Sequence, residues 1–176
     1  MIALVTGLSD SKYFSRDYDL TVGVNDCPYP VDHLLVADHP SVFKPDRLRT
    51  IMNHPAKLFT HIPQWNKLRQ ANMIQLANKR SNVAQLKNKV NYCYSVCSPF
   101  IAIVHAFYQG ATEIHIAGVD ITGHPNLGTP DKIKIIKKDF TALYQELKKY
   151  ACDIYLIKSN PDGVLLDIIP KKERQP

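Results

Sequence analysis

The stretch SVCSPFIAIVHAFYQGATEIHIAGVD, residues 95–120, decides the fold of this chain. Ser98 is a favourable helix N-cap, and Pro99 suits the first helical position, where a missing N–H costs nothing. Residues 100–109 are almost wholly apolar, which predicts a buried helix. Gly110 is placed to end that helix in the left-handed conformation.

The residues after this helix predict a strand with a site at its end. Residues 113–118 read as a buried strand, and Asp120 follows at its carboxyl end. Helix, glycine, short loop, strand and acidic residue make one unit of an open α/β sheet. Ligands bind such sheets in the crevice outside the carboxyl ends of the strands. We therefore expect a site beside Asp120.

Similar units occur along the rest of the chain. Apolar or alternating runs predict further strands, two amphipathic patterns predict helices, and no hairpin signal separates the strands. This pattern predicts an α/β, Rossmann-like three-layer fold with a mostly parallel central sheet. The expected strands are 2–6, 18–24, 33–37, 57–60 and 153–157, and the expected helices are 44–54 and 130–150.

Polar residues follow each of the first three predicted strands. Gly7 and Ser9 open a loop that either cradles a phosphate with backbone N–H groups or simply connects two elements. Asn25 either hydrogen-bonds a base, ribose or phosphate, or forms an Asx-turn. Asp38 and His39 follow the third strand. The carboxyl ends of parallel strands share one edge, so we expect these side chains to converge there.

Composition limits the partners and the compartment. The 22 basic and 16 acidic residues give a net charge of +6, which indicates an anionic partner or a solvated basic surface. The four cysteines include no CxxC pair, so we expect reduced thiols in a cytoplasmic protein and no metal site. The first ten residues lack the basic flank of a signal peptide, and no apolar run is long enough for a membrane span.

Residues 1–170 are expected to form a single α/β domain, followed by a basic tail at 171–176. A polar excursion at about 62–94 reads as helical or irregular, and it is either a lid or a surface facing nucleic acid. Aromatic residues are sparse there, so a stacking platform for single strands is not indicated and nucleic acid is not the expected partner. Assembly into a homo-oligomer is left open.

Several of these segments together resemble a known group of proteins. They are Val22-Gly23-Val24-Asn25, the helix after Ser98, the strand at 113–120 and the run DFTALYQELKKYACDIYLIKSNPDGVLLDIIP at 139–170. The chain resembles the bacterial lipooligosaccharide sialyltransferases of glycosyltransferase family 42. It also resembles their relatives, the MAF flagellin-glycosylation proteins and the archaeal 6-hydroxymethylpterin diphosphokinases.

The resemblance implies a nucleotide-binding transferase, a sialyltransferase-like glycosyltransferase that uses a nucleotide-activated small molecule as donor. Asn25 and Ser98 would contact the nucleotide, and Gly7, Ser9 and Asp38 would complete the binding set. His124 or His39 would act as the base, with Asp120 as a further catalytic candidate.

Two other functions stay open at this point. One is a Mg²⁺-dependent pyrophosphokinase acting on a pterin, with Asp10, Asp26, Asp38 and Asp120 as oxygen ligands. The other is a non-catalytic ligand-binding protein on the same scaffold. The first loop of the sialyltransferases reads Gly-Asn-Gly-Pro-Ser, whereas this chain has Gly7-Leu8-Ser9-Asp10-Ser11, and this difference favours a binding protein.

Overall fold

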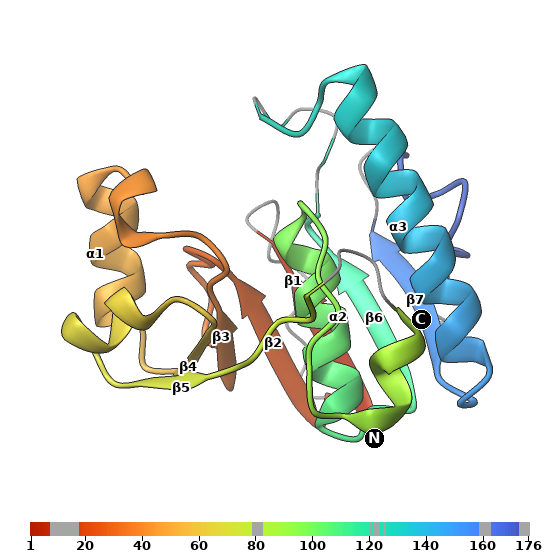
Figure 1. Cartoon of the computed structure of the whole chain (residues 1–176), viewed down its shortest axis with the longest axis horizontal. Coiled ribbons are helices and arrows are strands. Elements are labelled where there is room, and N and C mark those ends of the chain that lie inside the picture. Colours follow the sequence, from red (N-terminus) through yellow and green to blue (C-terminus); the bar gives the residue numbers. More distant parts are fainter. Residues whose placement is uncertain are drawn as a thin grey trace.

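A computed structural model describes residues 1–7, 18–78, 83–119, 121, 124, 126–158 and 163–172. Seven strands form one sheet in the order β5-β4-β3-β2-β1-β6-β7, and every pair in it is parallel (Figure 1). The strands are β1 Ile2–Thr6, β2 Leu20–Val24, β3 His33–Leu35, β4 Lys57–Thr60, β5 Ala71–Met73, β6 Glu113–Ala117 and β7 Asp153–Lys158.

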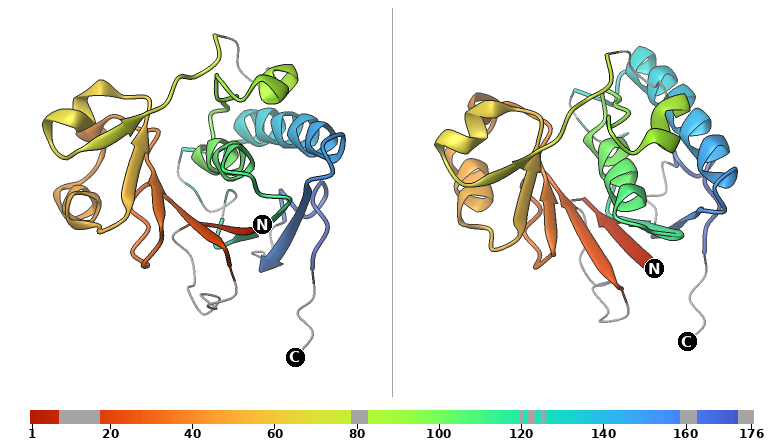
Figure 2. Two further views of the ribbon diagram at one scale, coloured as in Figure 1. Left: turned by 90° about the horizontal axis from the view of Figure 1, so that it is seen from below. Right: turned by 60° about the horizontal axis from the view of Figure 1, so that its bottom comes forward.

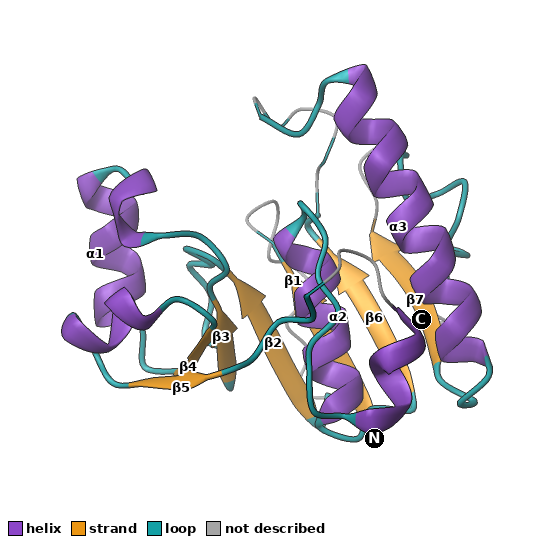
Figure 3. Cartoon of the chain, viewed as in Figure 1, coloured by secondary structure: helices purple, strands orange, loops and turns teal. Residues whose placement is uncertain are grey.

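Helices lie on both faces of this sheet, with α1 (Pro45–Asn53) on the second face at the β3–β4 end, and this arrangement makes three layers. Figures 2 and 3 show α2 (Ser98–Tyr108) and α3 (Pro130–Lys148) on the first face. The short 3₁₀ helices are η1 Pro40–Val42, η2 Pro63–Lys67 and η3 Val83–Asn88. The architecture confirms the predicted α/β three-layer fold with a parallel sheet.

Side-chain alternation along the strands explains the layers. In β1, Ala3 and Val5 pack into the main core under α2, whereas Leu4 belongs to a small cluster on the opposite face. Toward β3 and β4 the opposite face carries a second core, in which Ile51 of α1 packs with Leu34 of β3. Strands buried on both faces read as continuous apolar runs, which is why the sequence reveals them so clearly.

The ends of α2 differ from the prediction by one residue at the start. The N-cap is Cys97, whose side chain makes no capping hydrogen bond, and Ser98 is the first helical residue. Gly110 follows the helix with φ +101°, as predicted. Ser98 lies in the first turn of α2, where its hydroxyl accepts a hydrogen bond from the side chain of Asn25.

The segment 62–94 contains a strand that the sequence did not indicate. Ala71–Met73 pairs in parallel with β4 and forms one edge of the sheet. The residues are half-buried or exposed and have no apolar alternation, so no periodic signal marks them. Further on, an isolated bridge joins Leu76 and Tyr92.

A polar cluster lies inside the main core. His105 of α2 is fully buried, and its Nε2 lies 2.9 Å from Nδ1 of His33. Its Nδ1 lies 3.1 Å from the hydroxyl of Tyr92. Burial, and secondarily the nearby His33, lowers the pKa of His105 to about 3. The ring is therefore neutral in the folded protein at neutral pH.

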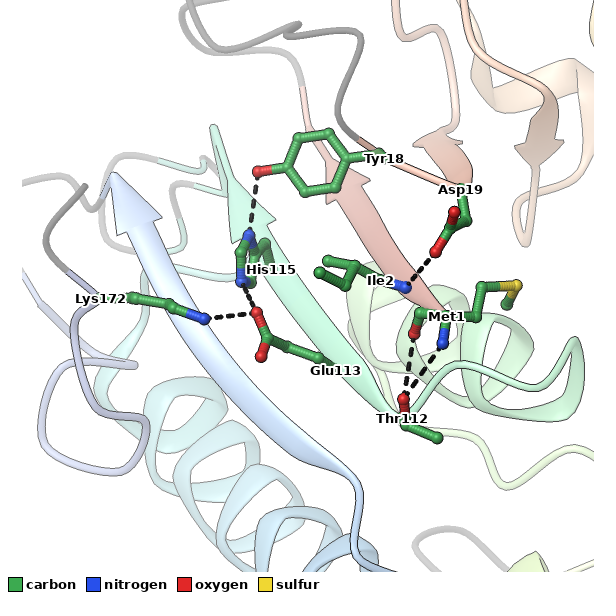
Figure 4. Close-up of polar contacts among 8 residues, drawn as sticks. All are labelled: Met1, Ile2, Tyr18, Asp19, Thr112, Glu113, His115 and Lys172. Carbon is green, nitrogen blue, oxygen red and sulfur yellow. Dashed lines mark hydrogen bonds and ion pairs between the residues drawn. The ribbon is translucent and has the colours of Figure 1, made fainter. Parts of the chain in front are cut away.

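The other face of the sheet carries a polar chain of side chains near β6 (Figure 4). The Tyr18 hydroxyl lies 3.0 Å from His115 Nδ1, and His115 Nε2 lies 2.5 Å from Glu113 Oε1. Lys172 donates to the same carboxylate oxygen at 2.5 Å. Lys171 also bridges to Leu156 in β7. The first two residues of the expected basic tail are thus attached to the sheet, and residues 173–176 lie outside the described part.

Two further findings concern the thiols and the membrane. All four cysteines, which are Cys27, Cys93, Cys97 and Cys152, are buried and free of disulfides. Within the described ranges, no helix has both the length and the apolar character needed to cross a membrane.

Candidate active site

A cavity of about 540 Å³ opens where β1, β2 and β6 end. Its lining includes Gly7, Asn25, Asp38, Ser98 and His124, which come from separate parts of the chain. The order of strands reverses at β1, because β2 lies on one side of it and β6 on the other. Parallel α/β sheets bind ligands at such a switch point, so the cavity lies where the fold predicts a site.

Asn25 is the residue around which the polar contacts of the cavity are organised. Its Nδ2 donates to Asp38 Oδ2 at 3.0 Å and to Ser98 Oγ at 3.5 Å. Its φ of +53° is in the left-handed region, which asparagine tolerates better than most residues. These bonds link the ends of β2, β3 and the start of α2.

The side-chain oxygen of Asn25 is the unusual atom of this group. Asn25 Oδ1 is buried and has no hydrogen-bond partner within the described part of the chain. An Asx-turn would use this oxygen to accept a local backbone N–H, so that alternative does not describe the residue. A buried acceptor without a donor destabilises the folded protein. A ligand that donates an N–H or O–H hydrogen bond to Asn25 Oδ1 would remove this penalty.

Asp38 is exposed, and hydrogen bonds hold both its side chain and its backbone at the cavity. Asn25 donates to its carboxylate, and Trp65 Nε1 donates to its backbone carbonyl at 2.9 Å. Beside it, Ser98 opens α2 directly after Cys97. Burial raises the pKa of the Cys97 thiol to about 12, so this cysteine lines the cavity as a thiol and is not a nucleophile.

Gly7 contributes to the cavity through its packing. Its N–H donates to the Ala117 carbonyl at 3.0 Å, so this N–H does not serve a phosphate as the cradle hypothesis expected. A Cβ at Gly7 would stand 2.2 Å from the carbonyl oxygen of Gly118. Glycine is therefore required for the close approach of the chain after β1 to the chain after β6. Ser9 and Asp120 lie outside the described residues.

The two candidate histidines lie in different settings. His124 is exposed and lines the cavity, and its Nδ1 accepts the Asn126 N–H at 3.2 Å. In the neutral ring the proton is then on Nε2. His39 is not among the lining residues; it caps η1, and its Nδ1 accepts the Ser41 N–H at 3.2 Å.

Arg47 lines the cavity although the sequence did not single it out. Its Nε and Nη2 donate to the two carboxylate oxygens of Asp26 at 2.6 and 2.5 Å. The hydrogen bond to Asp26 is the largest of the causes that raise the pKa of Arg47. The signal available was its place in the first turns of α1, since helices that follow parallel strands begin near the carboxyl edge.

Metal ligands do not gather in the described part of the chain, where no group of three or more histidine, cysteine or acidic side chains is close enough to hold an ion. Of the carboxylates considered for Mg²⁺, Asp26 is engaged by Arg47. Asp10 and Asp120 lie outside the described residues.

Comparison with known proteins finds solved structures with a similar fold. No protein-family model matches the sequence, and no curated protein matches it. Among solved structures, sialyltransferase CST-II in complex with a trisaccharide acceptor and CMP matches with a TM-score of 0.58 and 14% identity, over 97% of this chain and 86% of that one. CstII from Campylobacter jejuni in complex with the substrate analogue CMP-3FNeuAc matches with a TM-score of 0.57 and 13% identity, over 97% and 84%. At this identity the likeness shows a shared fold.

Proposed function

We propose that this protein is a glycosyltransferase whose donor sugar is activated by a nucleotide, with a cytidine nucleotide as the first candidate. One observation carries the proposal. The cavity at the switch point joins Asn25 and Ser98 through a hydrogen-bonded contact, on a fold shared over 97% of the chain with enzymes solved with CMP and with a CMP-sugar analogue.

The unpaired oxygen of Asn25 supports a nucleoside as the ligand. Asn25 Oδ1 needs a donor, and a nucleobase amino group or a ribose hydroxyl supplies one. Ser98 can both donate and accept beside it. Asp38 adds a second acceptor at the cavity, which suits hydroxyl groups of a ribose or a sugar.

His124 is the group best placed to move a proton. With Nδ1 accepting from Asn126, the neutral ring offers its Nε2 proton to a ligand. This state suits hydrogen bonding to the leaving nucleotide, whose oxygen gains charge in the transition state. To take a proton from an acceptor hydroxyl, the ring must release Asn126 and carry its proton on Nδ1.

Ligand binding to the native state tests the proposal. The full chain is titrated with CMP, UDP, GDP, ATP and CMP-sialic acid, each with and without Mg²⁺, by thermal shift and calorimetry. A ligand at a hundredfold excess over its Kd stabilises by about 2.7 kcal/mol, or roughly 5–10 °C for a chain of this size. We expect CMP and the CMP-sugar to raise the melting temperature without metal; no response to any nucleotide would reject the proposal.

Two variants show whether the response arises at this cavity. Asn25→Gly keeps the left-handed backbone and removes the amide, and Ser98→Ala removes only a hydroxyl. Both should weaken nucleotide binding at least tenfold. Asn53→Ala, at the exposed end of α1, is the matched control and should bind as the unaltered protein does. Unchanged binding by both Asn25→Gly and Ser98→Ala would place the site elsewhere.

A further inference from the structure

We infer that Arg47 binds the anionic group of the ligand in the cavity and that buried Asp26 positions it for this task. The inference rests on the proposed function only in naming the anion as the phosphate of a nucleotide. It assigns a residue of α1, outside the set that the sequence indicated, to substrate binding.

The guanidinium of Arg47 has one edge engaged and another edge open. Two of the five N–H donors of an arginine bond Asp26, so three remain for a ligand. The Arg47 side chain is 42% exposed, whereas that of Asp26 is 9% exposed. An arginine present only to neutralise a buried carboxylate would be buried with it, but this one extends from the carboxylate to the cavity wall.

The guanidinium is also held in a fixed plane. A fork-to-fork pair with a carboxylate fixes the orientation of both groups. The Arg47 Cζ lies 5.4 Å from the centroid of the Phe43 ring, which also lines the cavity. A pre-oriented guanidinium loses little freedom when it meets an oxyanion, so it binds an anion more strongly than a mobile side chain would.

The distribution of charge around the cavity favours Arg47 as the residue that binds an anion. Of the lining residues that the structure describes, Arg47 is the one that carries a permanent positive charge. Asp38 opposes it: this carboxylate is close enough to contribute to the raised pKa of Arg47. An anion bound by Arg47 is therefore repelled by the Asp38 carboxylate, and removing the charge of Asp38 should strengthen anion binding.

The test compares ligands that differ by a phosphate. Calorimetry gives the Kd of cytidine, CMP and inorganic pyrophosphate for the unaltered protein, Arg47→Lys and the double variant Asp26→Asn with Arg47→Met. The double variant leaves no uncompensated buried carboxylate, so it should fold. Arg49→Met is the control, since Arg49 is on the same helix and exposed. Asp26→Asn and Asp38→Asn are measured alone.

We expect CMP to bind at least tenfold more tightly than cytidine, as hydrogen bonds to charged groups predict. This advantage should disappear in the double variant, shrink in Arg47→Lys and persist in Arg49→Met, while cytidine affinity stays constant. Asp26→Asn should also reduce it, and Asp38→Asn should increase it. Tighter CMP binding by Asp26→Asn would overturn the positioning role of Asp26, and an unchanged advantage in the double variant would overturn the binding role of Arg47.

The two proposals fail in different ways. If CMP and cytidine do not bind but pyrophosphate binds and requires Arg47, the anion site stands and the cytidine nucleotide is rejected. If CMP binds equally well with and without Arg47, the proposed function stands and the anion site is rejected. If none of the three probes binds the unaltered protein, both the anion site and the cytidine nucleotide are rejected.

Discussion

Mild acid should destabilise this fold through His105. The ring is fully buried, and its pKa of about 3 lies below the value of about 6.5 for histidine in an unfolded chain. Between these two pH values the unfolded state binds a proton that the folded state does not bind. Stability therefore rises with pH across this window, and it falls as the pH drops through 6.5.

The magnitude follows from the same difference. Each pH unit inside the window costs about 1.4 kcal/mol of unfolding free energy. Integrated from pH 7 to pH 5, with an unfolded-state pKa of about 6.5, the loss is about 2 kcal/mol. Small proteins are stable by only about 5–15 kcal/mol, so the effect is readily measurable.

The assay is urea unfolding at pH 7, 6 and 5, followed by the fluorescence of the single tryptophan, Trp65, which is fully buried. In His105→Gln the unfolding free energy should fall by about 2 kcal/mol less over this range than in the unaltered protein. Ile103→Val, a core change in the same helix without a titrating group, should keep the original pH dependence. The reasoning is refuted if His105→Gln also keeps it.

Further predictions concern the site and the two faces of the sheet. His124→Gln should lower the rate of sugar transfer about 100-fold with little change in nucleotide Kd, whereas His39→Gln should change neither, in steady-state assays run side by side. Burial acts to raise the pKa of Glu113, but bonds to Lys172 and His115 outweigh it and lower the pKa. The stabilisation is thus present above the ordinary glutamate pKa and lost as pH falls through the folded value; Glu113→Gln should remove a contribution below about 1 kcal/mol, seen as a weaker pH dependence of acid unfolding. Gly7→Ala should destabilise by more than about 2 kcal/mol because its Cβ meets a carbonyl oxygen at 2.2 Å, whereas Gly110→Ala, with only its positive φ to strain it, should cost about 1 kcal/mol; urea denaturation decides whether this order holds.

The parallel sheet could be predicted because its strands are buried on both faces. Runs such as Ile2–Thr6 leave a continuous apolar signal, and glycine or polar residues mark where each run ends. The edge strand Ala71–Met73 left no such signal, because it is held by backbone hydrogen bonds and its side chains are largely exposed. The local sequence pattern thus reveals a strand only where its side chains are buried and therefore apolar.

The residues of the site could also be predicted only in part from the sequence. Strand ends and parallel order bring Asn25, Asp38 and Ser98 to one edge, and the sequence contains both pieces of information. The ion pair of Arg47 and Asp26 depends on how α1 lies against the end of β2, which no local pattern encodes. The neutral state of His105 is likewise invisible in the sequence, because burial by distant residues produces it.

The central position of β1 in the sheet affects how the chain folds. One edge of β1 pairs with β2 soon after it in the chain, but the other pairs with β6, and the bond from Met1 to Thr112 spans 111 residues. During synthesis β1 leaves the ribosome well before β6, so this edge of β1 stays unpaired until β6 has emerged. Such long-range closure slows folding and leaves a template for mispairing. We therefore expect fragments that end before β6 to aggregate and the full chain to refold better when a chaperone is present.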